Sequence, residues 1–74
     1  MEKGKIVQVL GPVVDVCFES ERLPDIKEAL TVDNHGKLQV MEVSQHMGNQ
    51  VVRCIILSSS EGLTKGMEVT ATGD

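Results

Sequence analysis

The feature that most limits the fold of this chain is a series of short aliphatic runs separated by turn residues. The first two lie in the stretch GKIVQVLGPVVDVCF, where only Gly11-Pro12 separates them. Each run is rich in β-branched residues, and none of the runs along the chain carries a sustained apolar stripe of helical period. The sequence therefore predicts an all-β fold. The predicted strands are Lys5–Leu10, Val13–Phe18, Ala29–Val32, Leu38–Gln45, Val51–Leu57 and Glu68–Ala71.

Alternation within two of these strands predicts which face meets the core. Successive side chains in a strand point to opposite faces, so one apolar set per strand can be buried together. We expect Asp15 and Arg53 on the outer face of their strands. The expected core sets are Val14, Val16 and Phe18 in the second strand, and Val52, Cys54 and Ile56 in the fifth.

Residues that accept a positive φ mark two hairpin turns, DNHG at Asp33–Gly36 and MGNQ at Met47–Gln50. The second turn would make Leu38–Gln45 and Val51–Leu57 neighbouring antiparallel strands. The stretch from Glu19 to Ala29 contains Pro24 and mixed charges. It is predicted to be a surface loop with a turn of helix near Asp25–Ala29. Ser58–Gly62 is predicted to be a polar loop, and Lys65-Gly66 a tight turn.

Two positions suggest that strands bend. Proline is tolerated in sheets at edges, strand starts and bulges, and the residue before it favours an extended backbone. We therefore interpret Gly11-Pro12 as a barrel corner rather than a hairpin turn. Alternation also slips between Val40 and Met41, which predicts a bulge or bend there. Short strands with such corners indicate a small closed or nearly closed antiparallel barrel, with a flat three-stranded sheet as the alternative.

Length and charge restrict the chain further. Its 74 residues allow one domain, 1–74, with a stability of about 3–5 kcal/mol. Phe18 is the sole aromatic residue, and the net charge is −4. Single-strand nucleic-acid binders need basic grooves and exposed aromatic rings, so nucleic acid is not an expected partner.

The search for catalytic motifs predicts no catalytic, cofactor-binding or metal-binding residue. Gly-Lys pairs at Gly4 and Gly36 are followed by Ile6 and Leu38, which cannot hold Mg²⁺ as the Ser or Thr of a P-loop does. The carboxylates are not paired in a way that separates two pKa values, and we expect Glu42 to be solvated or paired with a cross-strand basic residue rather than catalytic. Loop roles are expected for the remaining candidates, Ser58–Ser60 as loop residues and His46 as a hydrogen-bonding turn residue.

The two cysteines, Cys17 and Cys54, both lie in apolar runs. We interpret them as buried small hydrophobes, with a disulfide or a shared metal as alternatives. His35 and His46 are not at metal-ligand spacing from either cysteine. The first residues lack the apolar core of a secretory signal, and no apolar run approaches the ~20 residues of a membrane span. We therefore expect a cytosolic protein.

Taken together, four stretches closely resemble the N-terminal segment of the catalytic beta subunit of F-type ATP synthase. They are GKIVQVLGPVVDVCF, LPDIKEAL, LQVMEVSQHMGNQVVRCIIL and EGLTKGMEVTATG, in unbroken order from Gly4 to Gly73. The opening and the EVSQHMGNQVVR centre match beta better than the non-catalytic alpha subunit. Cys17 and Cys54 depart from the family pattern, which argues against a shared role for the thiols.

The resemblance implies a six-stranded Greek-key barrel that helps to hold an alternating alpha/beta hexamer together. Alpha subunits would be its partners, at the cytoplasmic face of a bacterial plasma membrane, within the peripheral sector of the synthase. ATP or ADP with Mg²⁺ would bind in a following domain, so this segment would not be an enzyme, although its parent would carry out proton-coupled (sometimes sodium-coupled) rotary ATP synthesis and hydrolysis. The lack of a transit peptide would fit a bacterial or plastid-encoded gene.

Three candidate contact surfaces follow from this assembly role: Arg53, the Asp33–Gly36 turn and the Glu19–Glu28 loop. The chain alone is expected to be a monomer without direct membrane insertion. Two alternative functions are the equivalent barrel of a flagellar or type III export ATPase and a free-standing small binding module.

Overall fold

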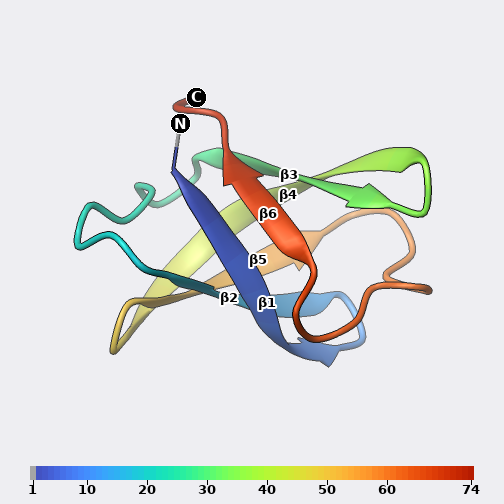
Figure 1. Cartoon of the computed structure of the whole chain (residues 1–74), viewed down its shortest axis with the longest axis horizontal. Coiled ribbons are helices and arrows are strands. Elements are labelled where there is room, and N and C mark those ends of the chain that lie inside the picture. The colour runs from blue at the N-terminus through green and yellow to red at the C-terminus, as the bar shows by residue number, and fades with distance from the viewer. Residues whose placement is uncertain (1) are drawn as a thin grey trace.

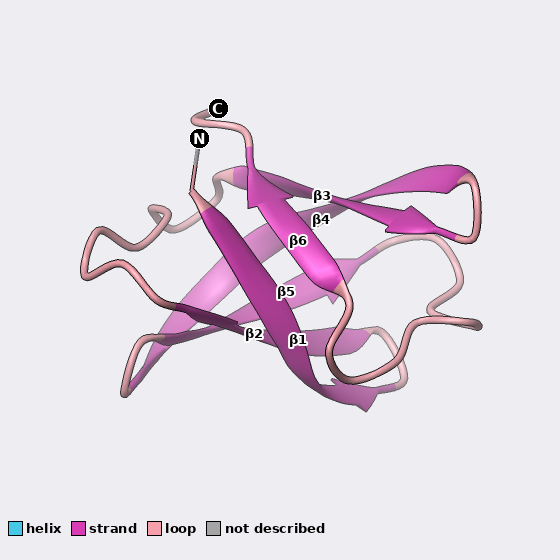
Figure 2. Ribbon diagram, in the orientation of Figure 1, coloured by secondary structure: helices cyan, strands magenta, loops and turns pink. Residues whose placement is uncertain are grey.

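Six strands form the framework of the computed structural model, which describes residues 2–74 (Figure 1). Loops and turns connect them, and the described residues contain no helix (Figure 2). Accordingly, no helix in this part of the chain is long and apolar enough to cross a membrane. The strands are β1 (Lys3–Leu10), β2 (Val13–Phe18), β3 (Ala29–Asn34), β4 (Lys37–Gly48), β5 (Val51–Ile56) and β6 (Glu68–Ala71).

The strands close into a barrel in the order β1-β2-β5-β4-β3-β6, and every neighbouring pair is antiparallel. Hairpins connect β3, β4 and β5, and β6 then returns to lie beside β3, which is the Greek-key arrangement. The predicted closed six-stranded barrel is confirmed, and the alternative of a flat three-stranded sheet is wrong. Closure gives each strand a hydrogen-bonding neighbour on both sides.

The strand limits follow backbone pairing rather than side-chain polarity. β2 and β6 have the predicted bounds. β1, β3 and β4 extend beyond the predicted ends, and β5 ends at Ile56 rather than at Leu57. Lys3 pairs with Thr70 of β6, and Lys37 pairs with Asn34 of β3. Backbone hydrogen bonds to the neighbouring strand therefore extend these strands over polar end residues, although polar residues do not by themselves predict a strand.

The barrel interior is filled by aliphatic side chains around the ring of Phe18, and the predicted core faces of β2 and β5 are confirmed. Gly4 makes room for this packing, because a Cβ there would lie 2.8 Å from both the carbonyl oxygen of Cys17 and Cγ1 of Val16. The buried apolar residues are Ile6, Val14, Val16, Phe18, Leu30, Val32, Met41, Val43, Val52, Cys54, Ile56, Leu63, Val69 and Ala71.

The prediction of a corner at Gly11-Pro12 is wrong, because these two residues form a hairpin turn. Leu10 pairs directly with Val13, so β1 and β2 are joined by a two-residue loop. Gly11 has a φ of 57°, while the ring of Pro12 holds its own φ near −65°. This sign pattern is that of a type II′ turn, which favours glycine at the first central position. A residue before proline usually has an extended backbone, but Gly11 adopts a positive φ instead, because glycine has no Cβ to oppose it.

The predicted bend between Val40 and Met41 is also wrong. β4 pairs with β3 without interruption from Lys37 to Glu42, and its register shifts against β5 come later, between Val43 and Gly48. Alternation continues because Gln39, which is buried, points inward, whereas Leu38 and Val40 point outward. The apparent slip in the sequence arises from a polar residue at an inward position and apolar residues at outward ones.

The remaining turn predictions have mixed outcomes. The turns at Asp33–Gly36 and Met47–Gln50 are confirmed, with positive φ at His35, Gly36, Gly48, Asn49 and Gln50. The turn of helix predicted near Asp25–Ala29 is wrong. The backbone forms a single turn there, closed by the amide of Glu28 donating to the carbonyl of Asp25 over 3.0 Å, and the φ of 73° at Lys27 is incompatible with a right-handed helix.

The type II′ turn predicts unequal effects of two substitutions. Gly11→Val should lower the free energy of unfolding by about 1–2 kcal/mol, because a branched side chain is strained at positive φ. Pro12→Ala should cost less than about 1 kcal/mol, because alanine can adopt the same φ and loses mainly chain stiffness. Urea unfolding of both variants measures the difference, and equal losses would contradict this turn geometry.

Candidate functional site

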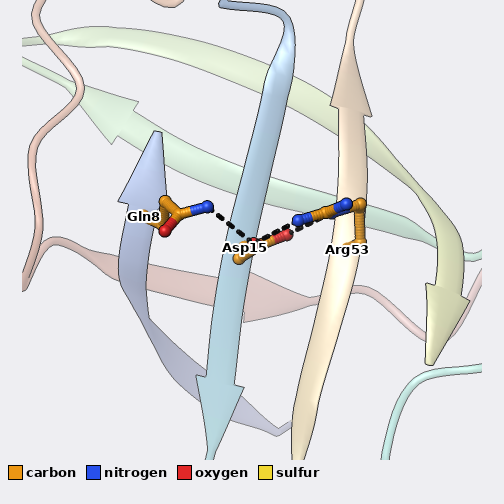
Figure 3. A network of polar contacts seen from close by, with 3 residues as sticks. All are labelled: Gln8, Asp15 and Arg53. Atoms are coloured by element: carbon orange, nitrogen blue, oxygen red, sulfur yellow. Dashed lines mark hydrogen bonds and ion pairs between the residues drawn. The ribbon is translucent and has the colours of Figure 1, made fainter. Parts of the chain in front are cut away.

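An ion pair spans the outer face of the barrel between β2 and β5 (Figure 3). Asp15 and Arg53 are direct cross-strand partners, and Nε and one terminal nitrogen of Arg53 donate to the two carboxylate oxygens over 2.9 and 3.0 Å. Gln8 of β1 points toward the same carboxylate, with its amide nitrogen 3.5 Å from Oδ2. Three strands are thereby linked through the carboxylate of Asp15, whose side chain is only 9% exposed.

The geometry of this pair is that of a structural contact. A bidentate guanidinium–carboxylate pair is among the stronger polar contacts in proteins, since both groups are charged and planar. The hydrogen bond to Asp15 and the charge of Asp15 raise the pKa of Arg53 above its ordinary value. Two nitrogens of Arg53 are therefore already hydrogen-bonded to another residue of this chain. Alternation predicted both residues on the outer face. It could not predict their pairing, because the sequence of neither strand determines the register of β2 against β5.

A second polar network closes one end of the barrel, and sequence reasoning missed it. Nδ2 of Asn34 donates to Oε1 of Gln39 and to the carbonyl of Glu61, both over 2.8 Å. Nε2 of Gln39 donates to Oγ of Ser58 over 3.1 Å and to the carbonyl of Ser59 over 2.9 Å. These contacts fasten the loop after β5 across the β3–β4 hairpin. The available signal was a pair of amide side chains, one within the DNHG turn (Asn34) and one shortly after it (Gln39).

The loop packs against this network closely. A Cβ at Gly62 would lie 2.7 Å from Oδ1 of Asn34, and Gly62 has a φ of 93°. Nε2 of His35 lies 3.3 Å from the carbonyl of Gly62, and Oγ of Ser59 accepts from the amide of Glu61. Ser58, through its hydroxyl, and Ser59, through its carbonyl, both accept from the buried side chain of Gln39, which supports the interpretation of Ser58–Ser60 as loop residues.

The hydrogen bond predicted for His46 is confirmed, but its predicted place in a turn is wrong, because His46 lies within β4 and pairs with Val52 of β5. Its Nε2 lies 2.7 Å from the carbonyl oxygen of Pro24, so the ring nitrogen donates and ties the Glu19–Glu28 loop to β4. Gln50 adds a second tie, donating to the carbonyl of Glu19 over 2.9 Å. Glu42 is exposed on the outer face of β4. The structure does not bring the weighed histidines, serines and carboxylates together: among residues 2–74, no three or more His, Cys, Asp or Glu side chains are grouped to hold a metal ion.

The two cysteines have different environments, and the alternative of a disulfide is wrong because both are free. Cys54 is a core residue, as predicted. The prediction that Cys17 is buried as well is wrong, because it is half-buried on the outer face. Burial, with a smaller contribution from the charge of Asp15, raises the pKa of the Cys54 thiol to about 12.

Two grooves lie on the outer surface of the barrel. We name them the β4–β5 groove, of about 420 Å³, and the β1–β6 groove, of about 400 Å³. β4 and β1 are three strands apart in either direction around the closed order, so these grooves lie on opposite sides. The β4–β5 groove is lined mainly by Leu38, Val40, Ile55 and Leu57 with Lys37 and Glu42, and the β1–β6 groove by Lys3, Lys5, Val7, Cys17, Glu19 and Glu68.

Comparison with known protein families assigns this barrel. Residues 6–73 match the family model described as the beta-barrel domain of the ATP synthase alpha/beta family. The chain belongs to the ATP synthase alpha/beta family. The match covers most of β1 and all of β2 to β6. Within the ATP synthase alpha/beta family, this domain is the non-catalytic N-terminal barrel.

The two thiols should differ sharply in reactivity. At pH 8, a pKa of about 12 leaves roughly one part in ten thousand of Cys54 as the reactive thiolate, and the core shields it as well. We expect the folded chain to react rapidly with Ellman's reagent at Cys17 alone and to expose the second thiol in denaturant. Cys17→Ser is the matched control, which should abolish the rapid reaction. Rapid modification of two thiols in the folded protein would contradict the buried position of Cys54.

Proposed function

We propose that this barrel is the N-terminal assembly domain of the catalytic beta subunit of an F-type ATP synthase, where it helps to hold the alternating alpha/beta hexamer together. The observation that supports this proposal most is the family match across residues 6–73 of a closed barrel. The stretches GKIVQVLGPVVDVCF and EVSQHMGNQVVR favour the beta subunit over alpha. Neighbouring alpha subunits are the proposed partners.

A closed barrel suits this role for a physical reason. Subunits that open and close around nucleotide need one layer that keeps the ring together. The interior here is filled by buried aliphatic side chains, and such interiors deform little. Because each strand is paired on both sides, a neighbour must bind through outer side chains and turns rather than by adding a strand. Grooves on opposite sides of the barrel suit a ring, in which every member contacts two neighbours.

In this proposal the parent subunit makes and hydrolyses ATP in a proton-coupled rotary enzyme, at the cytoplasmic face of the plasma membrane. The barrel itself performs no reaction. ATP or ADP and Mg²⁺ are bound by a following domain of the parent, and the barrel binds neither.

The assembly role predicts binding to an alpha subunit. We expect the 74-residue chain to be monomeric alone at micromolar concentration and to co-sediment with a purified alpha subunit of an F-type ATP synthase. A purified subunit of a flagellar export ATPase is the matched control and should not bind. Sedimentation velocity measures both. Binding to the export ATPase in place of alpha would contradict the beta-subunit assignment and favour the export-type alternative.

The same proposal predicts that nucleotide leaves the barrel unaffected. We expect no saturable change in amide chemical shifts when ATP with Mg²⁺ is titrated to millimolar concentration. ADP with Mg²⁺ serves as the second ligand. Localised, saturable shifts at micromolar ATP would contradict the assembly role and favour a free-standing binding module.

A further inference from the structure

The β4–β5 groove holds three of the most exposed large apolar side chains of the barrel. Leu57 is 97% exposed, Leu38 68% and Val40 55%. All three line the same groove, together with the half-buried Ile55. Single exposed apolar residues need no explanation, but a contiguous apolar surface on a small soluble domain indicates a contact with another molecule.

Folding does not explain why this surface is apolar. In a sheet with one buried face, the outward positions are usually polar and the inward positions apolar. The start of β4 has the opposite arrangement, with Gln39 buried between the outward Leu38 and Val40. Neither outward side chain contributes to the buried core. Their apolar character therefore points to an interaction outside this chain.

Leu57 is held in place although it is almost fully exposed. The two residues that follow it, Ser58 and Ser59, are both hydrogen-bonded by the buried amide of Gln39, over 3.1 and 2.9 Å. The side chain of Gln39 is itself oriented by Asn34. The rim of the groove is therefore ordered before any partner arrives, which lowers the entropy lost on binding.

A second copy of this chain does not fit the groove. Two β4–β5 grooves facing each other would join two concave surfaces and leave unfilled space between them. A head-to-tail copy would place the β1–β6 groove against it, with Lys3, Lys5, Glu19 and Glu68 facing leucine. Removing these charges from water against apolar groups is costly even for Lys3 and Glu68, which pair with each other. The occupant must instead present an apolar ridge.

Charges at the two ends of the groove define the occupant further. Lys37 and Glu42 both line it, and they are five positions apart along β4, which is about 16 Å. Within residues 2–74, neither side chain takes part in the ion pairs of the barrel, which join Lys3 to Glu68 and Arg53 to Asp15. Complementary charges on a partner would fix its direction along the groove.

We propose that a protruding apolar segment of the neighbouring alpha subunit binds in the β4–β5 groove. This segment carries an acidic group near Lys37 and a basic group near Glu42. This inference rests on the function proposed above and identifies the surface that serves it. The apolar rim supplies the contact area, and the two end charges select the orientation.

The experiment compares two leucines of similar exposure on opposite sides of the barrel. Leu38→Glu places a charge in the groove, whereas Leu10→Glu changes a side chain of β1 that is 57% exposed and does not line it. We expect Leu38→Glu to weaken the affinity for purified alpha subunit by about tenfold or more, and Leu10→Glu by less than about twofold. Lys37→Glu should weaken it as well, and Val40→Ser is a milder second variant of the apolar rim. Circular dichroism melting checks that each variant folds.

The outcomes separate this inference from the proposed function. If the unaltered chain binds alpha and both leucine variants bind it as tightly as the unaltered chain, the groove is not the binding site and only this inference is overturned. A larger loss for Leu10→Glu has the same meaning. If the unaltered chain does not bind alpha, the proposed function fails and this inference fails with it. A dimer of the chain alone that is lost in Leu38→Glu would make a second copy the occupant and overturn the inference.

Discussion

Closure of the sheet through β1 and β6 is the constraint on which the rest of this structure depends. The seam pairs Lys3, Gly4 and Lys5 of the first strand with residues of the last. The two described ends of the chain meet there, where the amide of Ala71 donates to the carbonyl of Glu2 over 2.8 Å (Figure 1). Gly4 is needed at this seam because Phe18 and Val16 fill the space that its side chain would take. The barrel thus closes around Phe18, the sole aromatic residue of the chain.

Much of the barrel could be predicted from the sequence because its strands are short, aliphatic and separated by strong turn signals. Val14, Val16 and Phe18 alternate with outward residues as the pattern requires, and all three are buried. The predictions failed where backbone geometry or a long-range contact decided the outcome. Gly11 could be extended or have a positive φ, and only its pairing context distinguishes a corner from a type II′ turn. The inward position of Gln39 is not evident from its polarity, because it depends on a contact with Ser58, which lies 19 positions further along the chain.

The polar contacts of the outer face show the same limit. Asp15 and Arg53 are 38 residues apart, and their pairing depends on the register of two strands that are not joined by a hairpin. The family resemblance supplied the topology that local patterns could not. It did not supply the pairing of side chains, because a shared fold does not specify which outward groups meet.

The buried amide network connects closure to the candidate contact surface. An inward glutamine is tolerated only if its donors and acceptor are satisfied, and here they are satisfied by Asn34 and by the loop after β5. Because Gln39 occupies the inward position, Leu38 and Val40 must point outward. The same amide fixes the loop that presents Leu57. One polar side chain inside the barrel therefore orders an apolar surface outside it, and this coupling follows from the alternation of a single strand.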